Sequence, residues 1–235
     1  MNRIKFLAKS AALSLLDLSK HRGHDLWRDM RYFHRVIDAP ETATLLDVGA
    51  NEGQTASAMA KAFPRSPVYS FEPCLDSFNK LVSNTARYKN VSAVKLGFGD
   101  TRELREIEHQ KFSTTNSLLA VPDPSLTSET IEIDTIDSFV AARNIDRIFL
   151  LKTDTEGFDL KVLNGASGSF RKKLVDYVLV EACFFKKMSL PQTDFTEVSN
   201  LLRDVGFHVS HMYENVYDLS GFLEPISSRN SGSGC

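Results

Sequence analysis

Five acidic residues end or closely follow short apolar segments of the kind that form buried strands: Asp47, Glu72, Asp100, Asp154 and Glu181. Parallel strands bring their carboxyl ends to one edge of a sheet, and ligands of open α/β sheets bind beyond that edge. Carboxylates there can accept hydrogen bonds from ligand hydroxyls or take a proton from a reacting group. The five positions therefore predict a ligand site with acid–base capacity on one rim of a sheet.

A glycine-containing turn follows the first of these strands, over residues 46–55. Gly49 and Gly53 allow the backbone to approach a ligand closely, and the start of the next helix offers free N–H groups to a carboxylate. The G-x-x-x-G spacing departs from the G-x-G-x-x-G spacing of dinucleotide sites. The same residues also fit a tight strand-to-helix turn without a ligand, so this motif alone leaves both interpretations open.

Glu72 ends the second strand, 23 residues after Gly49. Folds of this type place an acid at about 20 residues from the glycine turn to bind the hydroxyls of a ribose. Glu caps helices poorly in comparison with Asp, Ser or Thr, so ribose binding is favoured over a capping role. Asp100 ends the sequence Gly97-Phe98-Gly99-Asp100, where it fits either the rim of an adenine pocket or a turn.

Lys152, Asp154 and Glu156 lie at the end of the fourth strand. A lysine at the end of a buried strand is costly unless it is paired, and neighbouring charges shift one another's pKa. Such a group suits proton transfer, which is the favoured interpretation. A structural ion pair with a helix cap by Asp154 or Thr155 is the alternative.

Alternating strands and helices must position these side chains, and the sequence predicts strands over 44–48, 68–71, 91–96, 148–152 and 177–181. Helices are expected over 55–63, 73–87, 137–144, 160–171 and 195–205. An excursion with strands over 103–112 and 129–133 interrupts the series. Residues 207–212 and 216–219 are expected to form a final hairpin. The fold class is therefore α/β, with a doubly wound, mostly parallel sheet and an antiparallel C-terminal hairpin strand.

Before residue 40 the pattern predicts helices, including one over residues 26–36. An apolar stripe of helical spacing precedes it: Ile4, Leu7, Ala11, Leu15 and Leu18. This stripe is expected to dock on the domain, and peripheral membrane contact through residues 1–20 is the alternative. We expect a helical extension over residues 1–40, one α/β domain over 41–223 and a flexible tail over 224–235.

Taken in order, these motifs resemble the FkbM family of S-adenosylmethionine-dependent methyltransferases. The resemblance runs over residues 44–210 and rests on the segments 47–53, 71–73, 116–118, 130–139, 152–158, 162–166 and 180–181. It implies a class I methyltransferase (Rossmann-like) fold and O-methylation. Thr153 and Thr155 depart from the family pattern, which more often has aliphatic residues there.

The resemblance also implies roles for individual residues. Asp47, Gly49, Asn51 and Gly53 would hold the methionine part of the cofactor, and Glu72 its ribose. Asp100 would lie near the adenine. Lys152, Asp154 and Glu156 would face the methyl group and the acceptor, and Asn116 and Ser117 belong to a short polar motif expected to contact substrate.

The expected reaction is methyl transfer to a hydroxyl of a sugar on a bacterial oligosaccharide, glycolipid or lipochitooligosaccharide. A deoxyhexose such as fucose or rhamnose is favoured by analogy. A weakly nucleophilic hydroxyl needs a base, for which Asp154 and Glu156 are the first candidates and Glu181 the second. The three acids could also offer oxygen ligands to Mg²⁺, but a metal is not favoured.

The composition of the chain narrows the classes of function and the cellular location that we expect. The chain has 235 residues and a formal net charge of −2, which argues against a nucleic-acid-coating protein. Three widely spaced cysteines form neither a disulfide framework nor a zinc pattern, so a cytoplasmic location is expected. The alternatives are a methyltransferase of a small natural product, a non-catalytic cofactor-binding module and a nicotinamide-dependent oxidoreductase. The sequence does not predict the oligomeric state.

Overall fold

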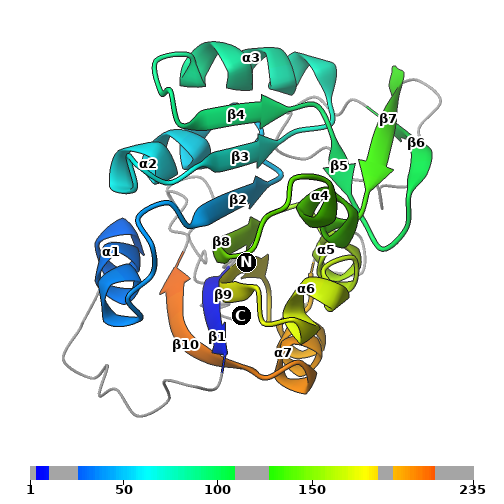
Figure 1. The fold of residues 1–235 in the computed structure, drawn as a ribbon. Helices are drawn as coiled ribbons and strands as arrows, with labels where there is room; N and C mark the ends of the chain where they lie inside the picture. The colour runs from blue at the N-terminus through cyan, green and yellow to red at the C-terminus, as the bar shows by residue number, and fades with distance from the viewer. Residues whose placement is uncertain (1–3, 11–25, 109–126, 185–192, 215–235) are drawn as a thin grey trace, which may run out of the picture.

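The computed structural model describes residues 4–10, 26–108, 127–184 and 193–214 of the chain. Seven strands form one sheet in the order β10-β1-β9-β8-β2-β3-β4 (Figure 1). These strands are β1 (Ile4–Ser10), β2 (Thr44–Val48), β3 (Val68–Phe71), β4 (Val91–Val94), β8 (Ile148–Thr153), β9 (Val175–Ala182) and β10 (Phe207–Glu214). Strands β4, β3, β2, β8 and β9 run parallel, as the alternating pattern predicts.

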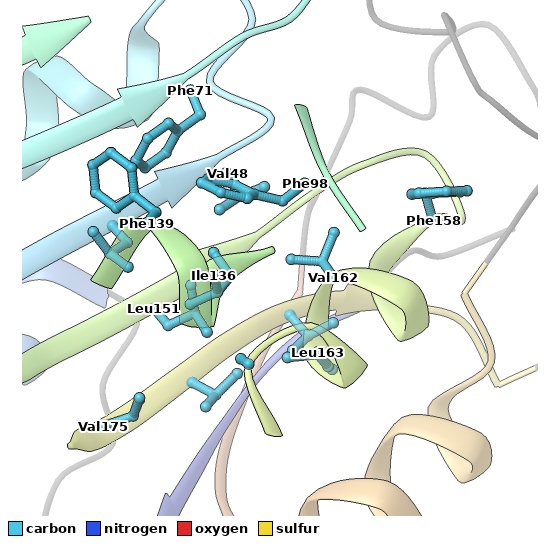
Figure 2. Packing of buried hydrophobic residues seen from close by; sticks show 14 of the residues in the cluster. Val48, Phe71, Phe98, Ile136, Phe139, Leu151, Phe158, Val162, Leu163 and Val175 are labelled. Carbon is cyan, nitrogen blue, oxygen red and sulfur yellow. The ribbon is translucent and has the colours of Figure 1, made fainter. Parts of the chain in front are cut away.

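Helices cover both faces of this sheet, which explains why β2 and β8 are buried along their whole length. One core joins the sheet to α4 (Ile136–Ala142), α5 (Asp159–Asn164), α6 (Ser167–Arg171) and α7 (Phe195–Asp204). Figure 2 shows part of it, with Phe71 and Phe139 side by side and Leu163 on the helix below. On the other face lie α1 (Leu26–Val36), α2 (Gln54–Ala62) and α3 (Leu75–Thr85).

The expected excursion forms a second, three-stranded sheet in the order β5-β7-β6. It consists of β5 (Gly97–Phe98), β6 (Glu103–Glu108) and β7 (Ser128–Asp134), and it lies beside the carboxyl end of β3 and β4 (Figure 1). Strand β7 pairs parallel with β5 and antiparallel with β6. Strand β6 agrees with the expected strand over residues 103–108, and residues 109–112 of that expectation lie outside the described part of the chain.

The single helix expected over residues 160–171 is in fact two, α5 and α6. Gly165 ends α5, and a side-chain carbon at this position would lie 2.0 Å from the carbonyl oxygen of Gly99. This close approach packs the helix against the turn that follows β5. The break between α5 and α6 is therefore a packing feature, which the apolar periodicity of the segment does not reveal.

The prediction of a helix at the N-terminus is wrong for residues 4–10. Ile4–Ser10 form β1, which pairs antiparallel with β9 on one side and β10 on the other. The apolar positions in a segment of only seven residues fit either a helical or a strand period, and pairing with the backbone groups of β9 and β10 decides in favour of a strand. The alternative of peripheral membrane contact through residues 1–20 assumed a helix, which residues 4–10 do not form. Residues 1–3 and 11–20 lie outside the described part of the chain.

The C-terminal part of the sheet also differs from the expected hairpin. Phe207–Glu214 form an edge strand as predicted, but its antiparallel partner is β1. Residues 216–219, the expected partner, lie outside the described residues. Among the helices described, none is long and apolar enough to cross a membrane.

Candidate active site

A cavity of about 420 Å³ opens at the carboxyl edge of the large sheet, between β2 and β8. The chain proceeds from β2 outward to β3 and β4 and then returns to β8 on the other side, so the cavity lies where the strand order reverses. Its volume is typical of small-molecule sites. Seven residues predicted from the sequence line it: Gly49, Asn51, Glu72, Lys152, Asp154, Glu156 and Glu181.

The glycine turn after β2 lies close against the end of β8. Gly49 has a φ of 72°, and a side-chain carbon there would lie 2.0 Å from the carbonyl oxygen of Asp154. Gly53 has a φ of 90° and begins α2, where a side-chain carbon would lie 2.8 Å from Leu81. Gly49 thus forms the cavity floor, whereas Gly53 supports the turn without lining the cavity.

Asn51 and Glu72 form a polar wall of the cavity. The Asn51 N–H donates to Oε2 of Glu72 at 2.9 Å, and the Cys74 N–H donates to Oε1 at 3.1 Å. Burial raises the pKa of Glu72 above its ordinary value, and the two backbone hydrogen bonds oppose this shift. Each carboxylate oxygen keeps acceptor capacity for a ligand hydroxyl, which is the requirement for binding a ribose diol.

Asn51 provides a second observation that favours a bound ligand. Its Oδ1 is buried and has no hydrogen-bond partner among the described residues. The residue has a φ of 47°, in the left-handed region that asparagine adopts more readily than most residues. A buried amide oxygen without a donor is costly, and an ammonium group such as that of methionine would satisfy it. The acceptor groups of Glu72 and Asn51 therefore fit the ribose hydroxyls and the ammonium group of S-adenosylmethionine.

Lys152 occupies the centre of a buried charge cluster. Its Nζ lies 3.0 Å from Oδ1 of Asp47 and 3.7 Å from Oδ2 of Asp154, and it donates to the Gly49 carbonyl oxygen at 2.9 Å. Burial by itself lowers the pKa of Lys152, but Asp47 and Asp154 outweigh it and hold the pKa above its ordinary value. Lys152 is consequently a fixed cation rather than a base.

Asp154, Glu156 and Glu181 converge beside this cation. One carboxylate oxygen from each lies within 4.8 Å of the others. Glu156 has a φ of 52° and precedes Gly157 with a φ of 96°, so a tight turn presents Glu156 to the cavity. The cluster can accept a proton, and its oxygen ligands also match the chemistry of Mg²⁺.

Besides Gly53, two more residues predicted to hold the cofactor do not line the cavity. Asp47 is fully buried beneath the cavity, where it binds Lys152 instead of lining the site. Asp100 is also absent from the lining, and its carboxylate faces Lys161 at 3.8 Å. The expected position of Asp100 near the adenine therefore stays a prediction. The predicted substrate residues Asn116 and Ser117 lie outside the described residues.

Apolar residues form the wall near Asp100, and the sequence analysis assigned them no role. Leu96, Phe98, Ile107 and Phe158 line this side of the cavity. Phe158 lies within the 152–158 motif, but Ile107 comes from β6, and its register against β7 decides that it points inward. Sequence reasoning also missed Asp159, a buried acid next to the motif. The only feature of the sequence that could have drawn attention to Asp159 is its position immediately before an expected helix.

Comparisons with known proteins agree with this geometry. The methyltransferase FkbM domain matches residues 47–209. "Methyltransferase 1" of Beauveria bassiana is 27% identical over 74% of this chain and 76% of that protein. The hexuronic acid methyltransferase AglP of Haloferax volcanii is 27% identical over 67% of this chain and 66% of its own length.

Two more distant similarities complete the comparison. The AMB antimetabolite synthetase AmbE of Pseudomonas aeruginosa is 26% identical over 79% of this chain, which spans only 10% of that protein. The crystal structure of a SAM-dependent methyltransferase from Aquifex aeolicus is 16% identical, with 80% of this chain and 86% of that chain covered and a TM-score of 0.41. The fold class rests on the strand order and on the domain match.

Proposed function

The chain belongs to the methyltransferase FkbM domain family and is an S-adenosylmethionine-dependent methyltransferase, and from this premise we propose that it methylates a hydroxyl group of a sugar. Within this class, a deoxyhexose such as fucose or rhamnose on an oligosaccharide, glycolipid or lipochitooligosaccharide is the proposed acceptor. The name of the hexuronic acid methyltransferase relative supports a sugar. It also makes an acidic sugar the first competitor to test.

One observation carries the proposal: three carboxylates meet in the same cavity as the ribose-type wall of Asn51 and Glu72. Bound S-adenosylmethionine supplies a methyl group on a positively charged sulfur, which needs no further activation. The protein must therefore orient the oxygen of the acceptor hydroxyl toward the methyl group and accept the proton of that hydroxyl. Orientation alone contributes about 7–11 kcal/mol in favourable cases.

The charge cluster suits this task. We assign proton acceptance to the turn carrying Asp154 and Glu156, with Glu181 as the second candidate. Lys152 lies 3.7 Å from Asp154, and its positive charge would hold that carboxylate in place. Carboxylates can also accept hydrogen bonds from the other hydroxyls of a sugar, so the same residues would help to select the acceptor.

The test is methyl transfer from isotope-labelled S-adenosylmethionine to a panel of sugars. The panel contains methyl glycosides of fucose, rhamnose and glucuronic acid, a lipochitooligosaccharide and a small phenol as a non-sugar control. Mass spectrometry should show one added methyl group on a sugar. Methylation of the phenol alone would overturn the sugar proposal, and methylation of glucuronide alone would replace the deoxyhexose by a hexuronic acid.

A further inference from the structure

Asp159 is buried with 1% of its surface exposed, and it does not line the cavity. Its Oδ1 accepts the hydroxyl of Thr153 at 2.6 Å and the N–H of Thr155 at 3.1 Å. Its Oδ2 accepts the hydroxyl of Thr193 at 2.5 Å. An acid in the first turn of a helix often interacts with that helix's own N–H groups, but these three donors all lie outside α5.

The three donors come from separate segments close to the acids Asp154, Glu156 and Glu181. Thr153 ends β8, and Thr155 lies between Asp154 and Glu156 in the following turn. Thr193 comes from the segment before α7, and its carbonyl oxygen accepts the N–H of Cys183 at 2.9 Å. Cys183 follows Glu181 by two residues. Asp159 thus links the turn that carries two of the acids to the strand that carries the third.

The burial of this carboxylate has a cost. Removal from water raises the pKa of Asp159 above its ordinary value, although the threonine hydroxyls oppose the shift. An apolar side chain would fill the same position without desolvating a charge. Unlike an apolar side chain, the carboxylate accepts hydrogen bonds from three donors and holds them in a fixed arrangement. Its contribution is therefore to the positions of these donors rather than to the net stability of the fold.

From these contacts we propose that Asp159 is a positioning residue, which fixes Asp154 and Glu156 relative to Glu181 so that the three acids meet at the acceptor. This inference rests on the proposed function for its catalytic meaning. Within the described part of the chain, Asp159 makes no hydrogen bond with Asn51 or Glu72. Its loss should therefore disturb turnover much more than cofactor binding.

The test compares Asp159→Ala with Asp159→Asn in the full chain. Alanine removes all three acceptor contacts, and a displacement of about 1 Å at a reacting centre costs about 100-fold in rate. We expect kcat for methyl transfer to fall by about this factor, with the calorimetric Kd for S-adenosylmethionine changed by less than about threefold. Asparagine keeps Oδ1 for Thr153 and Thr155, and the Thr193 hydroxyl can rotate to accept from its amide, so most of kcat should return.

Asp137→Ala is the matched control. The Asp137 carboxylate also accepts three hydrogen bonds, from the N–H groups of Gly168 and Ser169 and from the Ser169 hydroxyl, and it does not line the cavity. Both alanine variants should lose stability, but only Asp159→Ala should lose kcat. Equal losses of kcat in the two variants, or full activity of Asp159→Ala, would overturn the positioning role.

Amide hydrogen exchange keeps the inference testable even if the wild-type protein methylates no sugar. In Asp159→Ala, the amides of Thr155 and Cys183 should exchange faster, while those of β2 and β3 stay protected. Uniformly faster exchange, or unchanged exchange at Thr155 and Cys183, would contradict the inference. Failure of the sugar panel with this local change present would overturn the proposed function alone.

Discussion

Asp47 and Lys152 are register partners on the adjacent parallel strands β2 and β8, and their side chains form an ion pair of 3.0 Å with no more than 3% of either side chain exposed. Lys152 lines the cavity and Asp47 lies beneath it, at the point where the strand order of the sheet reverses. Lys152 reaches from this pair to the Gly49 carbonyl oxygen and toward Asp154. Lys152 therefore connects the glycine turn after β2 to Asp154 at the end of β8.

Removal of the cation should destabilise the whole domain. In Lys152→Met the carboxylate of Asp47 stays buried without its counter-charge, which costs about 3–5 kcal/mol. Urea unfolding should show this loss at neutral pH. The double variant Asp47→Asn/Lys152→Met should recover much of the stability, because no charge is left buried. A single variant as stable as the wild type would contradict a structural role for the pair.

Cofactor binding should depend on the ionisation of Glu72. The ordinary pKa of a glutamate is 4.5, and burial raises that of Glu72. Because ribose hydroxyls need the ionised acceptor, affinity should fall as the pH drops through the raised pKa, with a midpoint above 4.5. Below the midpoint the loss is about tenfold per pH unit. Calorimetric titration with S-adenosylmethionine across pH measures this directly.

The control for Glu72 is Glu72→Gln, which should bind the cofactor weakly at every pH. Its affinity should show no acid-dependent decline between pH 4.5 and neutrality. Glu72→Ala should abolish binding at the concentrations used. Unchanged affinity in Glu72→Ala would remove the ribose assignment.

Substitution of each acid of the cluster Asp154, Glu156 and Glu181 should show which one acts as the general base. Asp154→Asn, Glu156→Gln and Glu181→Gln each remove one proton acceptor, and the loss of a general base lowers turnover by about 10²–10⁴-fold. We expect the largest fall in kcat for Asp154 or Glu156, with cofactor affinity nearly unchanged in all three. The residue whose variant also loses the acidic limb of the pH–rate profile is the base. Full activity of all three variants would exclude acid–base catalysis by this cluster.

Turnover should not require a divalent metal. The oxygens of Asp154, Glu156 and Glu181 lie close enough to share one, but the Lys152 ammonium already lies 3.7 Å from Asp154 and would repel a second cation. Activity after dialysis against a chelator should therefore equal that of the untreated protein. A loss that added Mg²⁺ restores would assign the cluster to metal binding instead.

Strand β1 should contribute to the stability of the large sheet. Phe6 is paired with Val180 on β9 and with Met212 on β10. Phe6→Pro removes a backbone donor from a strand with partners on both sides, which central strands do not tolerate. Thermal unfolding should show a melting temperature lower by at least about 4 °C, the shift that about 1–2 kcal/mol produces in a chain of this size. Phe6→Val keeps the backbone donor, so its melting temperature should stay above that of Phe6→Pro.

The sequence by itself determined the parallel core and seven of the residues that line the cavity. Apolar runs that end in glycine or an acid encode strand–turn–helix units locally, so the turn at Gly49, Glu72 and the segment 152–158 were recognisable without the fold. The α/β class followed from the order of these units. The cavity then formed at the predicted edge of the sheet because parallel strands share one carboxyl edge.

Only the tertiary structure decided how distant segments combine. Residues 4–10 form a strand because β9 and β10 offer backbone partners from about 170 to 210 residues further along the chain. Asp100 faces Lys161 instead of the cavity, and Asp159 meets Thr193, through packing that no local pattern contains. Local patterns fix periodicity and turns, whereas these contacts depend on which surfaces the folded chain brings together.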